Sequence, residues 1–168
     1  RSQISEALRE AASSGQAGQG AQTNQTTLSL EELQEKVLIG EDSRGLVIKL
    51  AARDFFPPGE AEVRPDMRPL LERLCKVLAA TPHSIRVEGH TDPSEIRTVG
   101  YASDWDLAAA RATGVVTQLV KRLGFYPARI SAVSLSHFHP ISDGDDDVSR
   151  GKNRRVEIIV YHPLKSGA

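Results

Sequence analysis

Long apolar runs, cysteine pairs and an excess of one charge are missing from this sequence, and each absence excludes a class of protein. No apolar run approaches the ~20 residues that a helix needs to span a bilayer, and no secretory signal is recognisable. The one cysteine, Cys75, excludes an internal disulfide and a cysteine-rich metal site. Lysine and arginine number 21 against 22 aspartate and glutamate residues, a net charge of -1. That balance gives no indication of a nucleic-acid or anionic-membrane partner.

Length and composition fit one globular domain with an added tail. The 168 residues are 39% hydrophobic, which suits a single buried core. Residues 11–27 are small, polar and uncharged, so burial cannot offset the entropy lost by ordering them. We therefore expect a flexible linker at 1–27 and one domain at 28–168. Because the first residue is Arg1, we expect a fragment whose targeting or membrane segment lies upstream.

The hydrophobic pattern predicts an α/β fold. Helices are expected at 28–38, at about 70–78 and at 104–123, with Ser29 and Ser103 as N-caps and Gly40 and Gly124 as stops. Strands are expected at 45–50, 84–88, 129–135 and 155–161. The order β-α-β-α-β-β, preceded by an extra N-terminal helix, describes a single α/β sandwich with a mixed sheet.

An acid at a strand end and a base on the next helix form the most informative pattern in the sequence. Asp92 ends the run Gly89-His90-Thr91-Asp92, and Arg111 shares one helix face with Asp104 and Leu107. Asp92 can receive an ammonium, and the Arg111 guanidinium can hold a carboxylate through two parallel hydrogen bonds. Spacing alone leaves a second interpretation open, in which Asp92 and Arg111 form a salt bridge that ties the loop to the helix.

The remaining constellations favour binding over catalysis. His137 and His139 alternate as two metal ligands on a strand would, but no third ligand lies at a convincing spacing. The acidic run 143–147 lacks the glycine and the glutamate of a calcium loop, which predicts a solvated loop. The sequence contains no nucleophile elbow and no glycine-rich phosphate loop. We therefore expect no metal, no cofactor and no enzymatic activity.

Several separated motifs resemble one family, the OmpA-like peptidoglycan-binding domain. The similarity covers about residues 30–161, in the same order throughout. The motifs are Gly89-His90-Thr91-Asp92, the helix from Leu107 to Ala112, and Asn153-Arg154-Arg155-Val156-Glu157. Two further segments are similar to one branch, the MotB-type subunits of flagellar stators: Ser103-Asp104-Trp105-Asp106-Leu107 and Phe55-Phe56-Pro57-Pro58-Gly59.

The resemblance implies a non-covalent anchor to the cell wall. The ligand would be the diaminopimelate-containing stem peptide of peptidoglycan, with its ammonium at Asp92 and its carboxylate at Arg111. Thr91, Asp104, Leu107 and Arg154 would complete the site. The chain would be the periplasmic domain of a dimeric, ion-conducting stator subunit of the bacterial inner membrane, with a MotA-type partner and a plug or linker at 1–27. The alternative is a generic OmpA-like or lipoprotein anchor.

Two departures from the family pattern lie near this site. Asp104 stands where the family has asparagine, which adds a negative charge. Ser134-Leu135-Ser136 replaces the usual Gly-Tyr-Gly and is followed by His137-Phe138-His139. These differences predict a reshaped wall-binding loop.

Overall fold

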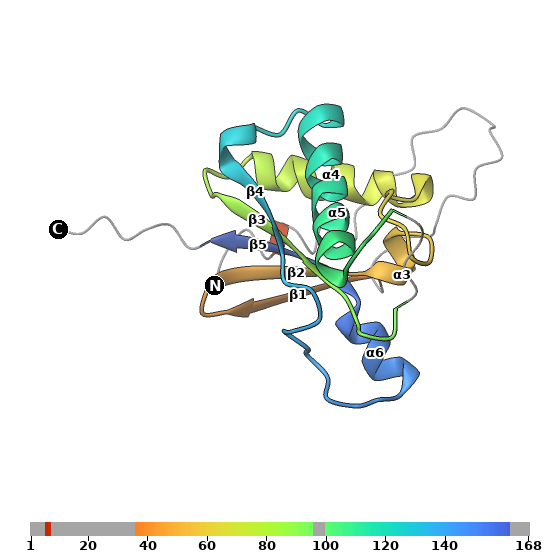
Figure 1. Cartoon of the computed structure of the whole chain (residues 1–168). Coiled ribbons are helices and arrows are strands. Elements are labelled where there is room, and N and C mark those ends of the chain that lie inside the picture. Colours follow the sequence, from red (N-terminus) through yellow and green to blue (C-terminus); the bar gives the residue numbers. More distant parts are fainter. Residues whose placement is uncertain (1–5, 8–35, 96–99, 162–168) are drawn as a thin grey trace, which may run out of the picture.

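A five-stranded mixed sheet forms the centre of the computed structural model, which describes residues 6–7, 36–95 and 100–161 (Figure 1). The strand order is β1-β2-β5-β3-β4. β3 and β4 run parallel, and the other neighbouring pairs run antiparallel. The predicted mixed sheet is therefore confirmed. Its strands are β1 (Val37–Asp42), β2 (Gly45–Ala51), β3 (Ile85–His90), β4 (Ile130–Ser134) and β5 (Arg155–Tyr161).

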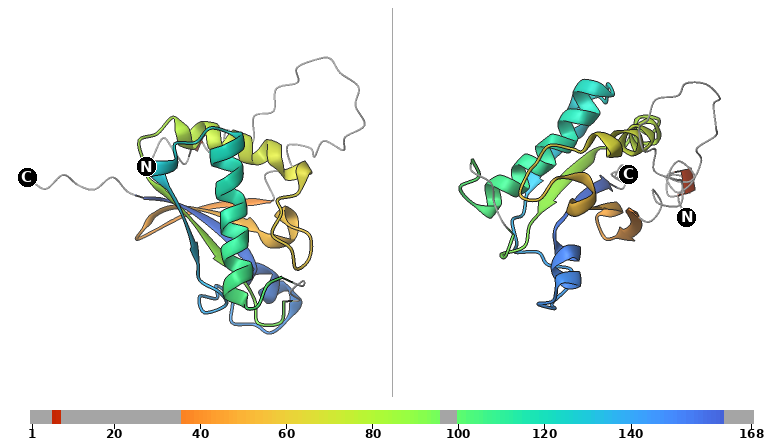
Figure 2. Two further views of the ribbon diagram at one scale, coloured as in Figure 1. Left: turned by 45° about the horizontal axis from the view of Figure 1, so that its top comes forward. Right: turned by 90° about the vertical axis from the view of Figure 1, so that its right-hand side faces the viewer.

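Two long helices, α4 (Arg68–Ala79) and α5 (Asp104–Thr117), cover one face of the sheet (Figures 1 and 2). α5 connects the parallel strands β3 and β4, so it is a crossover that returns the chain across that face. The other helices are short: α3 (Ala52–Phe55), α6 (Asp147–Asn153), 3-10 turns at Pro65–Met67 and Pro127–Arg129, and a π-helical turn at Gln118–Arg122. Within the described residues, none of the helices has the length and apolarity needed to cross a bilayer.

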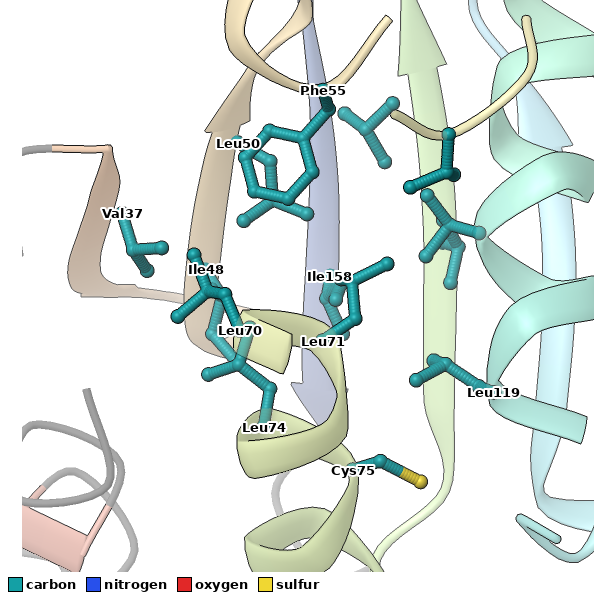
Figure 3. Packing of buried hydrophobic residues seen from close by; sticks show 14 of the residues in the cluster. Val37, Ile48, Leu50, Phe55, Leu70, Leu71, Leu74, Cys75, Leu119 and Ile158 are labelled. Atoms are coloured by element: carbon teal, nitrogen blue, oxygen red, sulfur yellow. The ribbon is translucent and has the colours of Figure 1, made fainter. Parts of the chain in front are cut away.

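Alternate strand residues and one stripe of α4 build the hydrophobic core. Ile48 of β2 and Ile158 of β5 are register partners on the covered face, and both are fully buried. Leu71 and Leu74 of α4 lie against this part of the sheet (Figure 3). Cys75 belongs to the same cluster, and burial raises the pKa of its thiol. Cys75 is therefore a packing residue rather than a reactive nucleophile.

α5 begins and ends close to its predicted limits. The Ser103 hydroxyl accepts a hydrogen bond from the Asp106 backbone N–H (3.3 Å), which confirms the predicted N-cap. After the π-helical turn, Gly124 takes a φ of +71°, a conformation that glycine adopts without strain. The predicted helix at 104–123 thus corresponds to α5 and the π-helical turn together.

The helix predicted at 28–38 is wrong where the structure describes it. Val37 and Leu38 lie in β1, which pairs antiparallel with β2, and Gly40 lies within the same strand. Residues 28–35 lie outside the described residues. A short run of leucine and valine fits the hydrophobic period of a helix and that of a strand. The free edge of β2 offers β1 a ladder of backbone hydrogen bonds, which favours the strand.

The solvated loop predicted at 143–147 is also only partly right. Asp143 and Asp145 are exposed, but Asp146 is the N-cap of α6. Its carboxylate accepts hydrogen bonds from the backbone N–H groups of Val148 and Ser149, each at 3.0 Å. The sequence signal was an aspartate in the capping position, which satisfies donors at a helix start.

β3 and α5 touch at Gly89. A Cβ atom on Gly89 would lie 2.0 Å from the carbonyl oxygen of Ala108 and 2.7 Å from its carbonyl carbon. Only a residue without a side chain allows the helix backbone so close to the strand. Arg111 follows Ala108 by about one helical turn, so this contact fixes its height above the end of β3.

The opposite face of the sheet carries a buried ionic cluster, which we define as Glu88, Glu157, Arg44, Arg86 and Arg155. Glu88 and Glu157 are direct cross-strand partners, an arrangement that is destabilising unless cations separate the two charges. Arg44 bridges them, with Nη1 2.9 Å from Glu88 Oε2 and Nη2 3.2 Å from Glu157 Oε2. Arg86 pairs with Glu88, and Arg155 Nε lies 2.6 Å from Glu157 Oε1.

We predict that Gly89→Ala unfolds at a lower urea concentration than the wild type. Its free energy of unfolding should be lower by about 1–3 kcal/mol or more, because the new methyl group forces α5 away from β3. Gly40→Ala is the matched control, since nothing lies within 4 Å of a Cβ at that strand position. Urea unfolding followed by circular dichroism measures both. Equal stabilities of the two variants would contradict the close contact.

The ionic cluster predicts a pH dependence of stability. Burial alone raises the pKa of Glu88, but the His90 contact and the Arg44 and Arg86 guanidinium groups lower it to about 2, from an ordinary value of 4.5. A depressed folded-state pKa stabilises the protein above about pH 4.5, and this stabilisation is lost as pH falls toward 2.

Arg44→Gln should therefore lower stability at neutral pH by about 1–3 kcal/mol and flatten its decline between pH 5 and 2. Urea unfolding at a series of pH values measures this. Arg122→Gln, which changes an exposed arginine far from the cluster in sequence, is the matched control. A decline in Arg44→Gln as steep as that of the wild type would show that Arg44 does not hold the Glu88 pKa down.

Candidate functional site

The loop that leaves β3 carries the predicted acid. Asp92 is 6% exposed, and its Oδ1 accepts a hydrogen bond from the Ser94 backbone N–H (2.9 Å) as well as one from the Ser94 hydroxyl. Glu95 N–H donates to the Asp92 carbonyl at 3.0 Å, which closes a four-residue turn. Thr91 is buried beside it, and its backbone N–H donates to the carbonyl of Ser136 at 2.9 Å. This turn therefore holds the Asp92 carboxylate in a defined position.

Arg154 reaches the same carboxylate from the start of β5. Its Nη2 lies 3.7 Å from Asp92 Oδ1, close enough for an ion pair but too long for a hydrogen bond. The Arg154 side chain is about one-third exposed. The structure thus brings together Asp92 and Arg154, two of the residues expected at one site.

Arg111 is buried on α5, and three groups hold it. Its Nε donates to the Glu60 carbonyl at 2.9 Å, and its guanidinium carbon lies 5.4 Å from the centre of the Phe56 ring. Its Nη1 lies 2.5 Å from Glu95 Oε1. Among the described residues the ion pair of Arg111 is therefore with Glu95, and the salt bridge to Asp92 considered from the sequence does not form.

Glu95 is the site residue that sequence reasoning missed. Its side chain is 7% exposed, and it belongs to the turn that begins at Asp92. The available signal was an acid three residues after Asp92 in the same loop. The turn therefore carries two acids, of which Glu95 pairs with Arg111 and Asp92 with Arg154.

The remaining predicted residues lie at the start of α5. Leu107 is fully buried and contributes packing, not a polar contact. Asp104 is the first residue of α5, and its Oδ2 lies 2.9 Å from Nδ1 of His137. The neighbouring Trp105 ring stacks on Phe138, with ring centres 5.5 Å apart, and both rings are about half exposed.

The two departures from the family pattern contact each other. Asp104, which replaces an asparagine, is the partner of His137, which follows the altered Ser134-Leu135-Ser136 segment. Ser136 has a φ of +51°, in the left-handed region that favours glycine. A glycine would adopt this conformation without strain, and Ser136 adopts it here.

A metal site can be assessed from the described ligands. Glu88, His90 and Glu157 place ligand atoms within 4.8 Å of one another. Both carboxylates, however, are already paired with arginines of the ionic cluster, so a divalent cation would have to displace these guanidinium groups. Burial lowers the pKa of His90, although its contact with Glu88 opposes that shift. The arrangement fits a structural ionic cluster better than a metal centre.

A hollow of about 260 Å³ lies elsewhere, between β1, β2 and α6. Residues of these elements and their neighbours line it, among them Lys36, Leu38, Lys49, Arg53 of α3 and Lys152. Thr91, Asp92, Asp104, Leu107, Arg111 and Arg154 do not line it. The charged residues of the predicted site, Asp92 and Arg111, are instead buried in ion pairs with Arg154 and Glu95.

Comparison with known proteins agrees with this fold. The OmpA family model matches residues 55–154. YtxE, an uncharacterised protein of Bacillus subtilis, is 34% identical over 135 residues, which are 80% of this chain and 56% of that protein. Other curated relatives carry the names Motility protein B and Peptidoglycan-associated lipoprotein. The chain spans about half the length of the curated relatives it matches first.

Solved structures give the same result. The periplasmic domain of Helicobacter pylori MotB has a TM-score of 0.71 and 28% identity, over 77% of this chain and 84% of that one. The cell wall anchor of the type VI secretion system (T6SS) from Pseudomonas aeruginosa has a TM-score of 0.71 and 30% identity, over 77% and 90%. With the family model matching more than half of its residues, this chain belongs to the OmpA family.

Proposed function

We propose that this chain is the periplasmic, peptidoglycan-binding part of a MotB-type flagellar stator subunit, which anchors an ion-conducting complex to the cell wall. Membership of the OmpA family and the relatives named Motility protein B support this proposal. So does the similarity to the periplasmic domain of MotB over most of both chains. The single observation that carries it is that one turn supplies both the buried Asp92 carboxylate and the Glu95 carboxylate that pairs with Arg111.

The ligand is the diaminopimelate residue of the stem peptide. Its ammonium binds the Asp92 carboxylate, and its carboxylate binds the Arg111 guanidinium. Arg154 lies at the edge of the site beside Asp92, and Asp104 forms the opposite edge with His137. Thr91 and Leu107 are buried, and they support the loop and the helix from which the two charges project.

This chain spans about half the length of its first curated relatives. We propose that the missing part contains a membrane helix, that the subunit is a dimer in the inner membrane, and that a MotA-type subunit is its partner. Residues 1–27 then form the linker or plug between membrane and domain. The site holds its charges in ion pairs and recognises a ligand without transforming it, so we assign no catalytic activity.

The alternative is a generic OmpA-like or lipoprotein anchor, which the relatives named Peptidoglycan-associated lipoprotein favour. The Trp105 segment and the Phe55-Phe56 segment are closer to the stator branch. The upstream sequence of the gene decides between the two, because a stator subunit needs a membrane helix with an ion-carrying aspartate. A lipoprotein instead needs an acylated cysteine near its N-terminus.

Binding to the wall tests the site. We expect the domain to co-sediment with purified diaminopimelate-type peptidoglycan, and Asp92→Asn and Arg111→Gln each to weaken this by about tenfold or more, since each removes one buried charge contact. Asp143→Asn and Arg122→Gln are the matched controls, because both residues are exposed and lie outside the site. Circular dichroism verifies that every variant is folded. Full retention of the folded Asp92→Asn and Arg111→Gln proteins on the wall would refute these roles.

A further inference from the structure

The carboxylate of Glu95 occupies the place at Arg111 that a ligand carboxylate would take. Glu95 Oε1 lies 2.5 Å from Arg111 Nη1, and both side chains are buried. The Asp92–Glu95 turn delivers this carboxylate, so the loop that offers Asp92 to an ammonium also neutralises Arg111. The Glu95 carboxylate therefore takes the place of the ligand carboxylate when no ligand is bound.

The contact between Glu95 and Arg111 is incomplete. Arg111 Nη1 and Glu95 Oε2 are buried atoms that have no hydrogen-bond partner among the described residues, so the pair is held by proximity of charge at one point. A carboxylate that accepts two parallel hydrogen bonds from a guanidinium forms a stronger pair. A suitably placed ligand carboxylate can therefore replace Glu95.

The Asp92 half of the site is neutralised in the same manner. Arg154 lies 3.7 Å from Asp92 Oδ1 and is partly exposed, so an ammonium can displace it at small cost. The four side chains, Asp92, Arg154, Arg111 and Glu95, sum to zero charge. A ligand with one ammonium and one carboxylate replaces both internal partners and preserves that balance.

We propose that Glu95 is an internal competitor for the ligand carboxylate at Arg111 and that it sets how strongly the domain prefers diaminopimelate over lysine in the stem peptide. This inference rests on the proposed binding of diaminopimelate at Asp92 and Arg111. Diaminopimelate and lysine side chains share the ammonium, but only diaminopimelate carries a second carboxylate. A diaminopimelate peptide must displace Glu95, whereas a lysine peptide binds Asp92 and leaves the Glu95–Arg111 pair intact.

Removing the negative charge of Glu95 should therefore favour one ligand alone. In Glu95→Gln, Arg111 keeps a neutral neighbour, and the ligand carboxylate no longer competes with an internal one. We expect the dissociation constant for a diaminopimelate stem tetrapeptide to fall by about tenfold, a typical minimum for a close charge pair. The dissociation constant for the otherwise identical lysine tetrapeptide should stay within about twofold, since its binding never involves Arg111.

Isothermal titration of the two synthetic tetrapeptides into the wild type and Glu95→Gln measures this difference. Glu60→Gln is the matched control, because Glu60 is exposed, contacts Arg111 only through its backbone carbonyl, and changes the net charge equally. The inference is supported if Glu95→Gln tightens diaminopimelate binding while Glu60→Gln does not. It is overturned if Glu95→Gln leaves diaminopimelate binding unchanged, if it tightens both peptides alike, or if Glu60→Gln has the same effect.

Arg111→Gln separates failure of this inference from failure of the proposed function. If Arg111→Gln weakens diaminopimelate binding but Glu95→Gln does not strengthen it, the binding site stands and the competition does not exist. If neither the wild type nor Glu95→Gln binds the diaminopimelate tetrapeptide, the proposed ligand and the inference both fail.

Discussion

The contact between Gly89 and the backbone of α5 is the constraint on which the candidate site depends. A side chain at this position would overlap the Ala108 carbonyl, so the strand and the helix can approach only because Gly89 has none. The approach sets α5 against the end of β3, where the chain turns at Asp92, and it holds Arg111 within reach of that turn. If α5 were displaced by the width of a methyl group, Arg111 would move away from the turn at Asp92.

Two groups of buried charges lie on either side of this strand end, and they differ in how firmly they are held. In the ionic cluster, Glu88 and Glu157 each contact two guanidinium groups. Displacing one guanidinium group therefore leaves each carboxylate with at least one other partner. At the candidate site, Asp92 and Arg111 each have one internal counter-charge at one point. The first arrangement holds the sheet together, whereas the second is the one in which we propose that a ligand replaces the internal partners.

The residues that depart from the family pattern near the site, Asp104 and the loop after β4, contact each other. The extra negative charge of Asp104 has His137 as its partner, and His137 belongs to the altered loop after β4. This loop also contacts the turn at Asp92, because the Thr91 N–H donates to the carbonyl of Ser136, which adopts a positive φ. Asp104 and the altered loop are therefore joined by a direct contact at the start of α5.

The local pattern of the sequence determined the elements that satisfy their own hydrogen bonds and bury their own apolar stripe: α4, α5 with its Ser103 cap, and β2, β3, β4 and β5 within a few residues. It also supplied Asp92 and Arg111 as opposite charges, because their spacing follows from one strand end and one helix face. Only the tertiary structure decided that Val37 and Leu38 extend as a strand, since the partner edge on β2 is formed by folding. It alone decided that Glu95, not Asp92, pairs with Arg111, because spacing in sequence does not fix which of two acids in one turn reaches a buried guanidinium.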